Sequence, residues 1–172
     1  MQAQISLEAI YARAYGRAIE PYPFQRALAV EPDIEVVIAP TGLGKTAGVT
    51  LGWVYRLVNT PQQTPHKLVW CLPMRTLVEQ IAGEVAGWIS RLQGIFVQVG
   101  QPLPTVHILM GGATSEDWRL HPEQAAVVVG TQDMLLSRAL MRGYGMSRFG
   151  WPIDFGLLHA DALWVFDEVQ LM

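Results

Sequence analysis

The stretch Val37–Thr46, VIAPTGLGKT, constrains the fold of this chain more than any other. It joins a short apolar, β-branched run at 34–39 to a segment at 45–59 whose apolar residues recur at helical spacing. Between them, Gly42 and Gly44 allow the backbone to curl so that successive N–H groups point at one anion, and the helix start adds its positive end. The stretch therefore predicts a strand, a phosphate-binding loop and a helix, in that order.

The rest of the chain alternates short apolar runs with segments of helical periodicity. A helix capped by Ser6 and closed by Gly16, and a second one entered through prolines at 21–30, precede the loop. We expect further strands at 67–72, 105–110, 125–130 and 162–166, further helices at 75–93 and 131–141, and an irregular Gly-rich segment at 142–152. Strands that are apolar along their whole length, alternating with helices, indicate a mostly parallel sheet covered on both faces. The expected fold class is therefore α/β.

Composition excludes several classes of protein. Cys71 is the only cysteine, so we expect no intrachain disulfide and no cysteine-based metal cluster. No stretch approaches the roughly 20 apolar residues that cross a bilayer, and the N-terminus carries no signal-peptide run. We therefore expect a cytoplasmic protein with no membrane partner. The net charge of −3 argues against binding nucleic acid through a broad basic face.

The predicted phosphate loop supplies the candidate nucleotide-binding residues Thr41, Gly42, Leu43, Gly44, Lys45 and Thr46. Lys45 can place a charge at the outer phosphates of ATP, and the hydroxyl of Thr46 can bind Mg²⁺. One alternative is a structural turn that happens to contain Gly-Lys-Thr. Another is a dinucleotide-binding loop, because Gly42, Gly44 and Ala47 have that spacing too, but the second expected strand ends WCLPMR without the required acid.

The stretch LWVFDEVQ, at 163–170, resembles the metal-binding end of the same kind of site. A strand there would deliver Asp167 beside the phosphate loop, where its carboxylate can hold Mg²⁺, and Glu168 can orient or deprotonate the attacking water. The alternative is a pair of surface acids. We predict Lys45, Asp167 and Glu168 as catalytic residues, and Thr46 and Asp167 as metal ligands.

The order of the motifs is itself distinctive. The chain carries, in sequence, Phe24-Gln25, APTGLGKT, LPMRTLVEQ, LMGG, GTQDMLLSRAL and FDEVQ. In this order they resemble the first RecA-like lobe of a superfamily-two helicase, from about residue 22 to the end of the chain. The segments CLPMRTLVEQ and RGYGMSRFGWPIDFGLLHADALWVFDEVQLM look most like the CRISPR-associated helicase-nuclease of type I systems, although Gln170 stands where many relatives have His or Asp.

The resemblance implies a P-loop (Walker A) ATPase with ATP and Mg²⁺ as cofactors and single-stranded DNA as a partner. Gln25 would contact the adenine edge. The residues that would line the track of one DNA strand are Pro73, Arg75, Gly111, Gly112, Thr131, Gln132 and Asp133. Thr131 stands where an expected strand meets an expected helix, so its hydroxyl and the free N–H groups can take a backbone phosphate. Plain helix capping is the alternative for Thr131 and Asp133.

The resemblance also implies a domain organisation. Residues 1–32 would form a helical lead-in that carries Gln25, and 33–172 an incomplete first RecA-like lobe, truncated after the acidic pair. The partners would be a second RecA-like lobe and a nuclease domain of a longer chain, and a CRISPR surveillance complex in antiviral defence. Since a facing lobe normally supplies an arginine, we expect an ATP-dependent DNA helicase whose isolated lobe binds ATP but hardly hydrolyses it. The alternatives are another superfamily-two DNA or RNA helicase, in repair or restriction, and a nucleotide-binding fragment without turnover.

Overall fold

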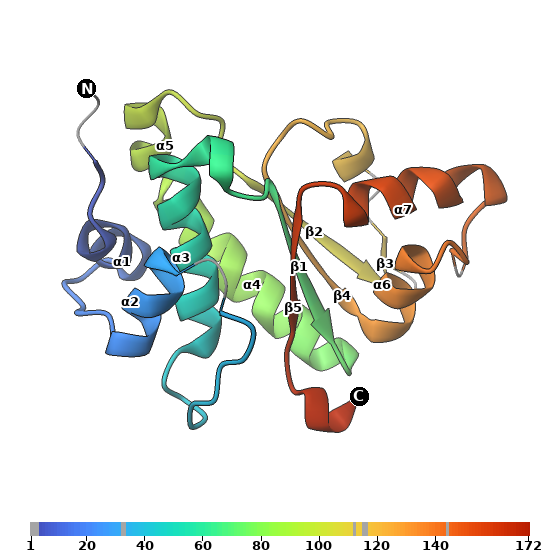
Figure 1. Cartoon of the computed structure of the whole chain (residues 1–172), viewed down its shortest axis with the longest axis horizontal. Coiled ribbons are helices and arrows are strands. Elements are labelled where there is room, and N and C mark those ends of the chain that lie inside the picture. Colours follow the sequence, from blue (N-terminus) through green and yellow to red (C-terminus); the bar gives the residue numbers. More distant parts are fainter. Residues whose placement is uncertain (1–3, 32–33, 112, 115–116, 144) are drawn as a thin grey trace. The chain divides into compact units, whose positions relative to one another are not determined.

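The computed structural model describes residues 4–31, 34–111, 113–114, 117–143 and 145–172 (Figure 1). The chain divides into two units. The helical unit comprises Met1–Thr64 and Gly87–Leu103, and the sheet unit comprises Pro65–Ala86 and Pro104–Met172. Helix α4 (Arg75–Arg91) begins in the sheet unit and ends in the helical unit.

The helical unit contains α1 (Leu7–Tyr15), α2 (Pro23–Val30), α3 (Lys45–Asn59), the 3₁₀ turn η1 (Pro61–Gln63) and α5 (Gln93–Val99). The first predicted helix is confirmed. Its start is capped by Ser6, whose hydroxyl accepts a hydrogen bond from the Ala9 amide at 3.2 Å, and it ends at Gly16 with a φ of 69°. The helix predicted at 75–93 ends at Arg91, and α5 follows it as a separate helix that the sequence does not predict.

Helices α2 and α3 pack closely because two residues of α3 have no side chain. A Cβ atom on Gly48 would lie 3.1 Å from Cγ of Gln25, and one on Gly52 would lie 3.2 Å from the Leu28 carbonyl oxygen. Leu51 and Trp53 of α3 are fully buried. This packing holds α2, which carries Gln25, against the helix that begins at the phosphate loop.

The strand predicted at 34–39 is wrong. Residues 34–40 form no strand, and Val36 and Ile38 expose 73% and 94% of their surface. A strand forms when its N–H and C=O groups find partners on a neighbouring strand. The β-branched composition of this run supplies the propensity, but none of the strands in the described residues pairs with it, so it remains irregular.

The sheet unit contains β1 (Lys67–Leu72), β2 (Thr105–Met110), β3 (Ala113–Thr114), β4 (Ala126–Thr131) and β5 (Ala162–Phe166). The sheet order is β3-β2-β4-β1-β5, in which β2, β4, β1 and β5 run parallel and β3 pairs antiparallel with β2. All six residues of β1 and of β4 are buried, as expected for inner parallel strands. The predicted α/β class with a mostly parallel sheet is confirmed.

The remaining elements of the sheet unit are η2 (Asp117–Arg119), α6 (Gln132–Ala139), η3 (Arg148–Gly150), α7 (Trp151–His159) and η4 (Val169–Leu171). Leu135 of α6 and Leu158 of α7 join one buried cluster with Val69, Leu109 and Val128 of the sheet. Helix α7 begins inside the segment that the sequence predicts to be irregular. No helix in the described part of the chain is long and apolar enough to cross a bilayer.

Strand β5 differs from the inner strands in burial. Its residues are partly buried, and Phe166 exposes 46% of its surface. It pairs with β1 on one side, and no strand of the described residues pairs with its other side. Trp164 fixes the strand to the end of α7, because its Nε1–H donates to the Leu158 carbonyl at 2.8 Å.

Candidate nucleotide and nucleic-acid site

The loop before α3 adopts the curl that its glycines permit. Gly42 has a φ of 81° and Gly44 a φ of 72°, both in the left-handed region that favours glycine. Thr41 and Gly42 are exposed, whereas Leu43, Gly44, Lys45 and Thr46 are partly buried. The loop therefore turns directly into α3 and presents one side to solvent.

The start of α3 has an unusual electrostatic character. The helix runs for 15 residues from Lys45, and its N-terminus has neither a side-chain cap nor an acidic residue in its first turn. The Nζ atom of Lys45 donates to the carbonyl oxygens of Ala39 at 2.9 Å and Pro40 at 3.3 Å. The first-turn N–H groups, the helix dipole and the ammonium together form a strong attractor for an anion such as a phosphate group.

Gln25 lies under this loop and is 4% exposed. Its Oε1 atom accepts a hydrogen bond from the Tyr22 amide at 2.9 Å, and its Nε2 atom donates to the Gly44 carbonyl at 2.9 Å and the Leu43 carbonyl at 3.4 Å. Both ends of the amide are therefore engaged within the protein. The structure gives Gln25 a positioning role that the sequence did not reveal, because the contact joins residues 19 positions apart.

The acidic pair follows directly after β5. The Asp167 amide donates to the Cys71 carbonyl at 3.2 Å and so extends the pairing with β1, while its Oδ1 atom accepts from the Glu168 amide at 3.0 Å. Glu168 has a φ of 54°, a conformation that costs energy for a residue with a side chain and is concentrated at functional sites. Gln170 donates from Nε2 to the Glu168 carboxylate.

Thr46 in the helical unit and Asp167 in the sheet unit each carry an oxygen donor of the kind that Mg²⁺ binds. This ion prefers oxygen ligands and is commonly held by one or two protein groups together with substrate phosphates. The Thr46 hydroxyl is in the first turn of α3, and the Asp167 carboxylate directly follows a strand. In contrast, Cys71 next to the acidic pair offers no reactive thiolate, because burial raises its pKa to about 11.

The predicted nucleic-acid residues share one edge of the sheet unit. They follow β1, β2 and β4, and these parallel neighbours end on the same side. Arg75 is exposed and donates from Nη2 to the Gly111 carbonyl at 2.5 Å, which joins the segments after β1 and β2. Pro73 is partly buried, and Gly111 is exposed. Gly112 lies outside the described residues.

Thr131 occupies the N-cap position of α6, with a φ of −72° and a ψ of 150°, and is 9% exposed. Its side chain makes no capping hydrogen bond, so the structure does not support capping by this hydroxyl. Gln132 is partly buried, and Asp133 is an exposed acid in the first turn. The start of α6 therefore resembles that of α3 in its missing cap but differs in carrying a negative charge.

A buried ion-pair cluster beside α6 was not found from the sequence. Asp154 of α7 is fully buried, and its carboxylate contacts Arg138 Nη1 at 2.6 Å, Arg119 Nη2 at 2.9 Å and Arg119 Nε at 2.6 Å. A charged residue inside the apolar run WPIDFGLL is the only signal that could have pointed to it. The cluster ties α7 to α6 and η2.

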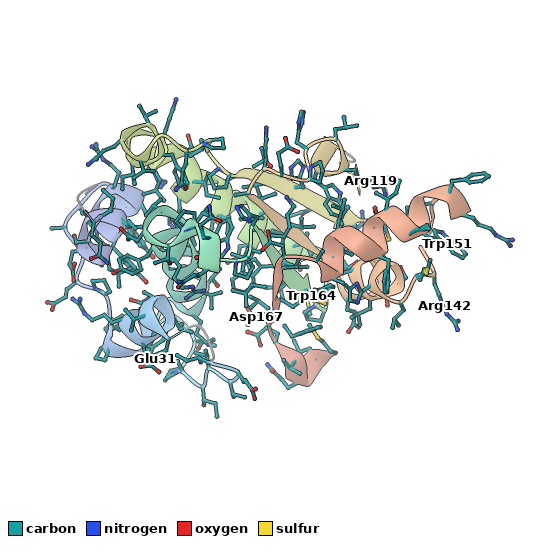
Figure 2. The ribbon with its side chains drawn as sticks, turned by 45° about the horizontal axis from the view of Figure 1, so that its top comes forward. Glu31, Arg119, Arg142, Trp151, Trp164 and Asp167 are labelled. Carbon is teal, nitrogen blue, oxygen red and sulfur yellow. The ribbon has the colours of Figure 1, made fainter. Side chains whose placement is uncertain are left out.

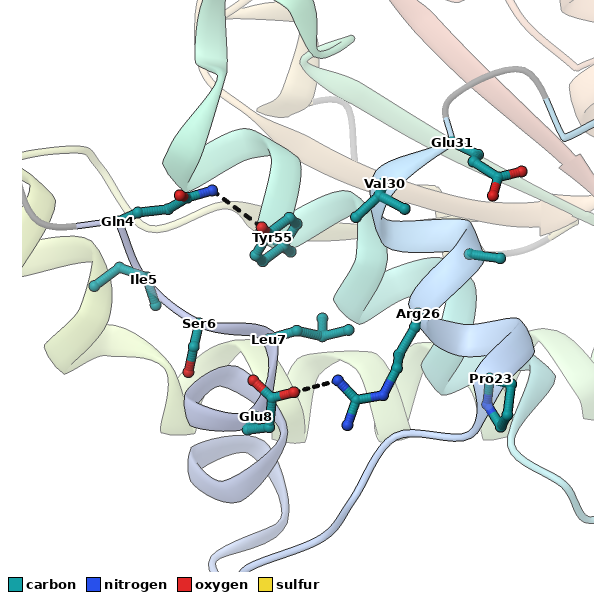
Figure 3. A pocket seen from close by; sticks show the side chains of 11 residues that line it. Gln4, Ile5, Ser6, Leu7, Glu8, Pro23, Arg26, Val30, Glu31 and Tyr55 are labelled. Carbon is teal, nitrogen blue, oxygen red and sulfur yellow. Dashed lines mark hydrogen bonds and ion pairs between the residues drawn. The ribbon is translucent and has the colours of Figure 1, made fainter.

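The helical unit also has a pocket of about 610 Å³ (Figure 3). It is lined by the segment before α1, by Tyr55 of α3 and by one face of α2, comprising Pro23, Arg26, Ala27 and Val30. The Gln4 side chain donates to the Tyr55 hydroxyl at 3.1 Å, and an ion pair joins Arg26 to Glu8. The hydrogen bond from Arg26 lowers the pKa of Glu8. Gln25 lies on a different face of α2, so this pocket is separate from the phosphate loop.

The chain was compared with known families and with curated proteins. The model of the DEAD/DEAH box helicase family matches residues 22–172. A comparison with curated proteins returned no match. The matched region runs from the start of α2 to the last residue and includes the phosphate loop, the acidic pair and the edge that carries Arg75 and Thr131. The chain therefore belongs to the DEAD/DEAH box helicase family.

Proposed function

We propose that this chain is the first lobe of an ATP-dependent DNA helicase or translocase of CRISPR type I interference. Family membership makes it an ATP-binding helicase lobe. One observation carries the nucleotide assignment: α3 starts behind two left-handed glycines with Lys45 at its first position and with no cap or acid in its first turn. Such a helix start binds phosphate.

The catalytic roles follow from the side chains at this site. Lys45 would give up its hydrogen bonds to the Ala39 and Pro40 carbonyl oxygens and bind the outer phosphates of ATP instead. Thr46 and Asp167 would supply oxygen ligands to Mg²⁺, which neutralises charge on the phosphates when it is bound. Glu168 would hold the attacking water and accept its proton. Gln25 could contact adenine only by giving up one of its hydrogen bonds to Tyr22 or Gly44. We therefore propose that its main role is to hold Gly44 in place.

The strand-binding role is supported by the edge at the ends of β1, β2 and β4. Arg75 and the uncapped start of α6 at Thr131 offer a cation and free N–H groups to backbone phosphates. Gly111, Gln132 and Asp133 would line the same track. Contacts of this kind carry no base information, so we expect binding without sequence preference.

The cellular assignment rests on the likeness of residues 142–172 to CRISPR-associated type I helicases. On this proposal the lobe works in the cytoplasm with a second RecA-like lobe, a nuclease domain and a CRISPR surveillance complex. We also propose a functional boundary at 32/33 between the lead-in and the lobe. Another DNA or RNA helicase, or a nucleotide-binding module without turnover, is the competing assignment.

Titration with a fluorescent ATP analogue in Mg²⁺ tests the nucleotide site. Lys45→Ala should weaken binding roughly 10- to 100-fold, because a charged contact to phosphate is lost. Arg17→Ala is the matched control, since it removes an exposed cation of the same helical unit and should leave the affinity unchanged. Equal affinity of the wild-type protein and Lys45→Ala would refute the assignment of the loop.

A further inference from the structure

The segment that joins α6 to α7, together with the first turns of α7, exposes apolar side chains and arginines. Phe149 exposes 92% of its surface, Ile153 51% and Phe155 39%, and Arg142 and Arg148 are also exposed. We call the surface formed by Arg142, Arg148, Phe149, Trp151, Ile153 and Phe155 the aromatic patch. Figure 2 shows Arg142 and Trp151 at the same end of α7. Several exposed apolar side chains within one short stretch of a chain favour a binding surface there.

The backbone beneath the patch is packed. A Cβ atom on Gly143 would lie 2.2 Å from Cδ1 of Trp151, so the glycine rests directly on the indole ring. The amides of Arg142 and Gly143 donate to the Ser137 carbonyl at 2.7 and 3.1 Å. The guanidinium carbon of Arg148 lies 6.0 Å from the centre of the Trp151 ring. The exposed Phe149 therefore lies in a segment whose backbone is held by contacts with Trp151 and Ser137.

The charge of this region is opposite to that of the whole chain. Residues 134–153 contain three arginines and no acidic residue, although the chain carries a net charge of −3. The next acid, Asp154, is fully buried and contacts both Arg119 and Arg138. Because Asp154 is buried, an approaching polyanion meets the exposed Arg142 and Arg148 and no exposed carboxylate in 134–154.

The composition of the patch identifies its occupant. The segment also exposes the aliphatic side chains of Leu140, Met141 and Ile153, so the arginines rather than the apolar side chains distinguish the occupant. Exposed rings beside arginines match a polyanion that carries flat bases, because bases stack on aromatic rings while arginines neutralise phosphates. We propose that the aromatic patch binds single-stranded nucleic acid, with a base stacked on Phe149 and phosphates held by Arg142 and Arg148. This inference rests on the proposed strand-binding function and extends it beyond the edge at Arg75 and Thr131.

Anisotropy of a fluorescein-labelled 20-nucleotide thymidine oligomer tests the stacking contact on the full chain. Phe149→Ala should weaken binding about 5- to 100-fold, and Phe149→Trp should restore it. Phe149→Leu should weaken binding like alanine, because leucine has no ring. Val97→Ala is the matched control, since Val97 exposes 73% of its surface on α5. Rescue by Phe149→Leu would overturn the stacking proposal.

Photocrosslinking with an oligomer that carries 5-iodouracil locates the contact. We expect crosslinks at Phe149 or Trp151. Crosslinks confined to the segments after β1, β2 and β4, with Phe149→Ala binding normally, would overturn the patch and leave the proposed function standing. If the wild-type chain binds no oligomer, the patch and the strand-binding role both fail, while the Lys45 titration still decides the nucleotide site. If Phe149→Ala abolishes self-association of the chain without changing oligomer affinity, the patch is a protein interface and the proposal is wrong.

Discussion

The starts of α3 and α6 are alike in one respect and differ in others, and on the proposed function this difference separates two kinds of phosphate binding. Both helices begin without a side-chain cap. The start of α3 adds two left-handed glycines and Lys45, whereas the start of α6 has Thr131 and an acid, Asp133, in its first turn. The first arrangement suits the concentrated charge of a nucleotide triphosphate. On the proposed function, the second would hold a single backbone phosphate more weakly, so that a moving strand could release it.

The largest effect should come from Gly44→Val. The substitution forces a β-branched residue to a φ of 72° and places its Cβ atom 2.9 Å from Nε2 of Gln25, so the loop must shift. Affinity for the fluorescent ATP analogue should fall about 10- to 100-fold, while oligomer binding should not change.

The control for this variant is Gly100→Val. Gly100 also has a left-handed φ, 69°, but a Cβ atom there would meet no atom within 4 Å. It should lose a similar amount of stability in thermal unfolding and none of its ATP affinity. If both variants lost ATP affinity equally, general destabilisation would explain the effect and the special role of the α3 start would be wrong.

A smaller effect is expected for Gln25→Ala. The variant loses the hydrogen bonds to Leu43 and Gly44, each of which contributes about 1 kcal/mol, so ATP affinity should fall about 5- to 20-fold. Gln98→Ala, an exposed glutamine on α5, should bind normally. The ratio of ATP to GTP affinity separates the two roles of Gln25. If Gln25→Ala leaves this ratio unchanged, the residue only positions the loop. If the ratio changes, Gln25 also contacts adenine.

The smallest effect belongs to α6. Asp133→Asn removes the acid from the first turn, so oligomer affinity should rise about 2- to 5-fold while ATP affinity is unchanged. Glu79→Gln, which removes an exposed acid of α4 in the same sheet unit, is the control. Weaker oligomer binding by Asp133→Asn would contradict phosphate binding at this helix start.

The sequence predicts those parts of the molecule that local patterns determine. The strands at 67–72, 105–110 and 162–166 are found at those positions, because each is a short, largely apolar run that pairs with a parallel neighbour. The left-handed glycines at 42 and 44 are likewise encoded within the loop itself. The run 34–39 has the same composition as the buried strands, but strand formation also depends on a partner that local sequence does not specify.

Contacts between distant residues account for what the sequence did not predict. Helix α7 is stabilised by Asp154, whose partners Arg119 and Arg138 lie 35 and 16 positions earlier. The local sequence around the start of α7 does not contain these partners, and its glycines predict a loop. The support that Gln25 gives to Gly44 is equally non-local. Thr131 makes no capping hydrogen bond although its residue type and position favour one, and the residue pattern alone does not distinguish the two cases.

Hydrogen–deuterium exchange with and without Mg²⁺–ATP tests the contrast between the two helix starts most directly. The first-turn amides of α3 should become protected when phosphate oxygens accept their hydrogen bonds, whereas those of α6 should exchange at an unchanged rate. Peptides covering 41–50 should therefore slow, and peptides covering 131–139 should not. Protection at 131–139 without protection at 41–50 would contradict the assignment of the nucleotide to α3.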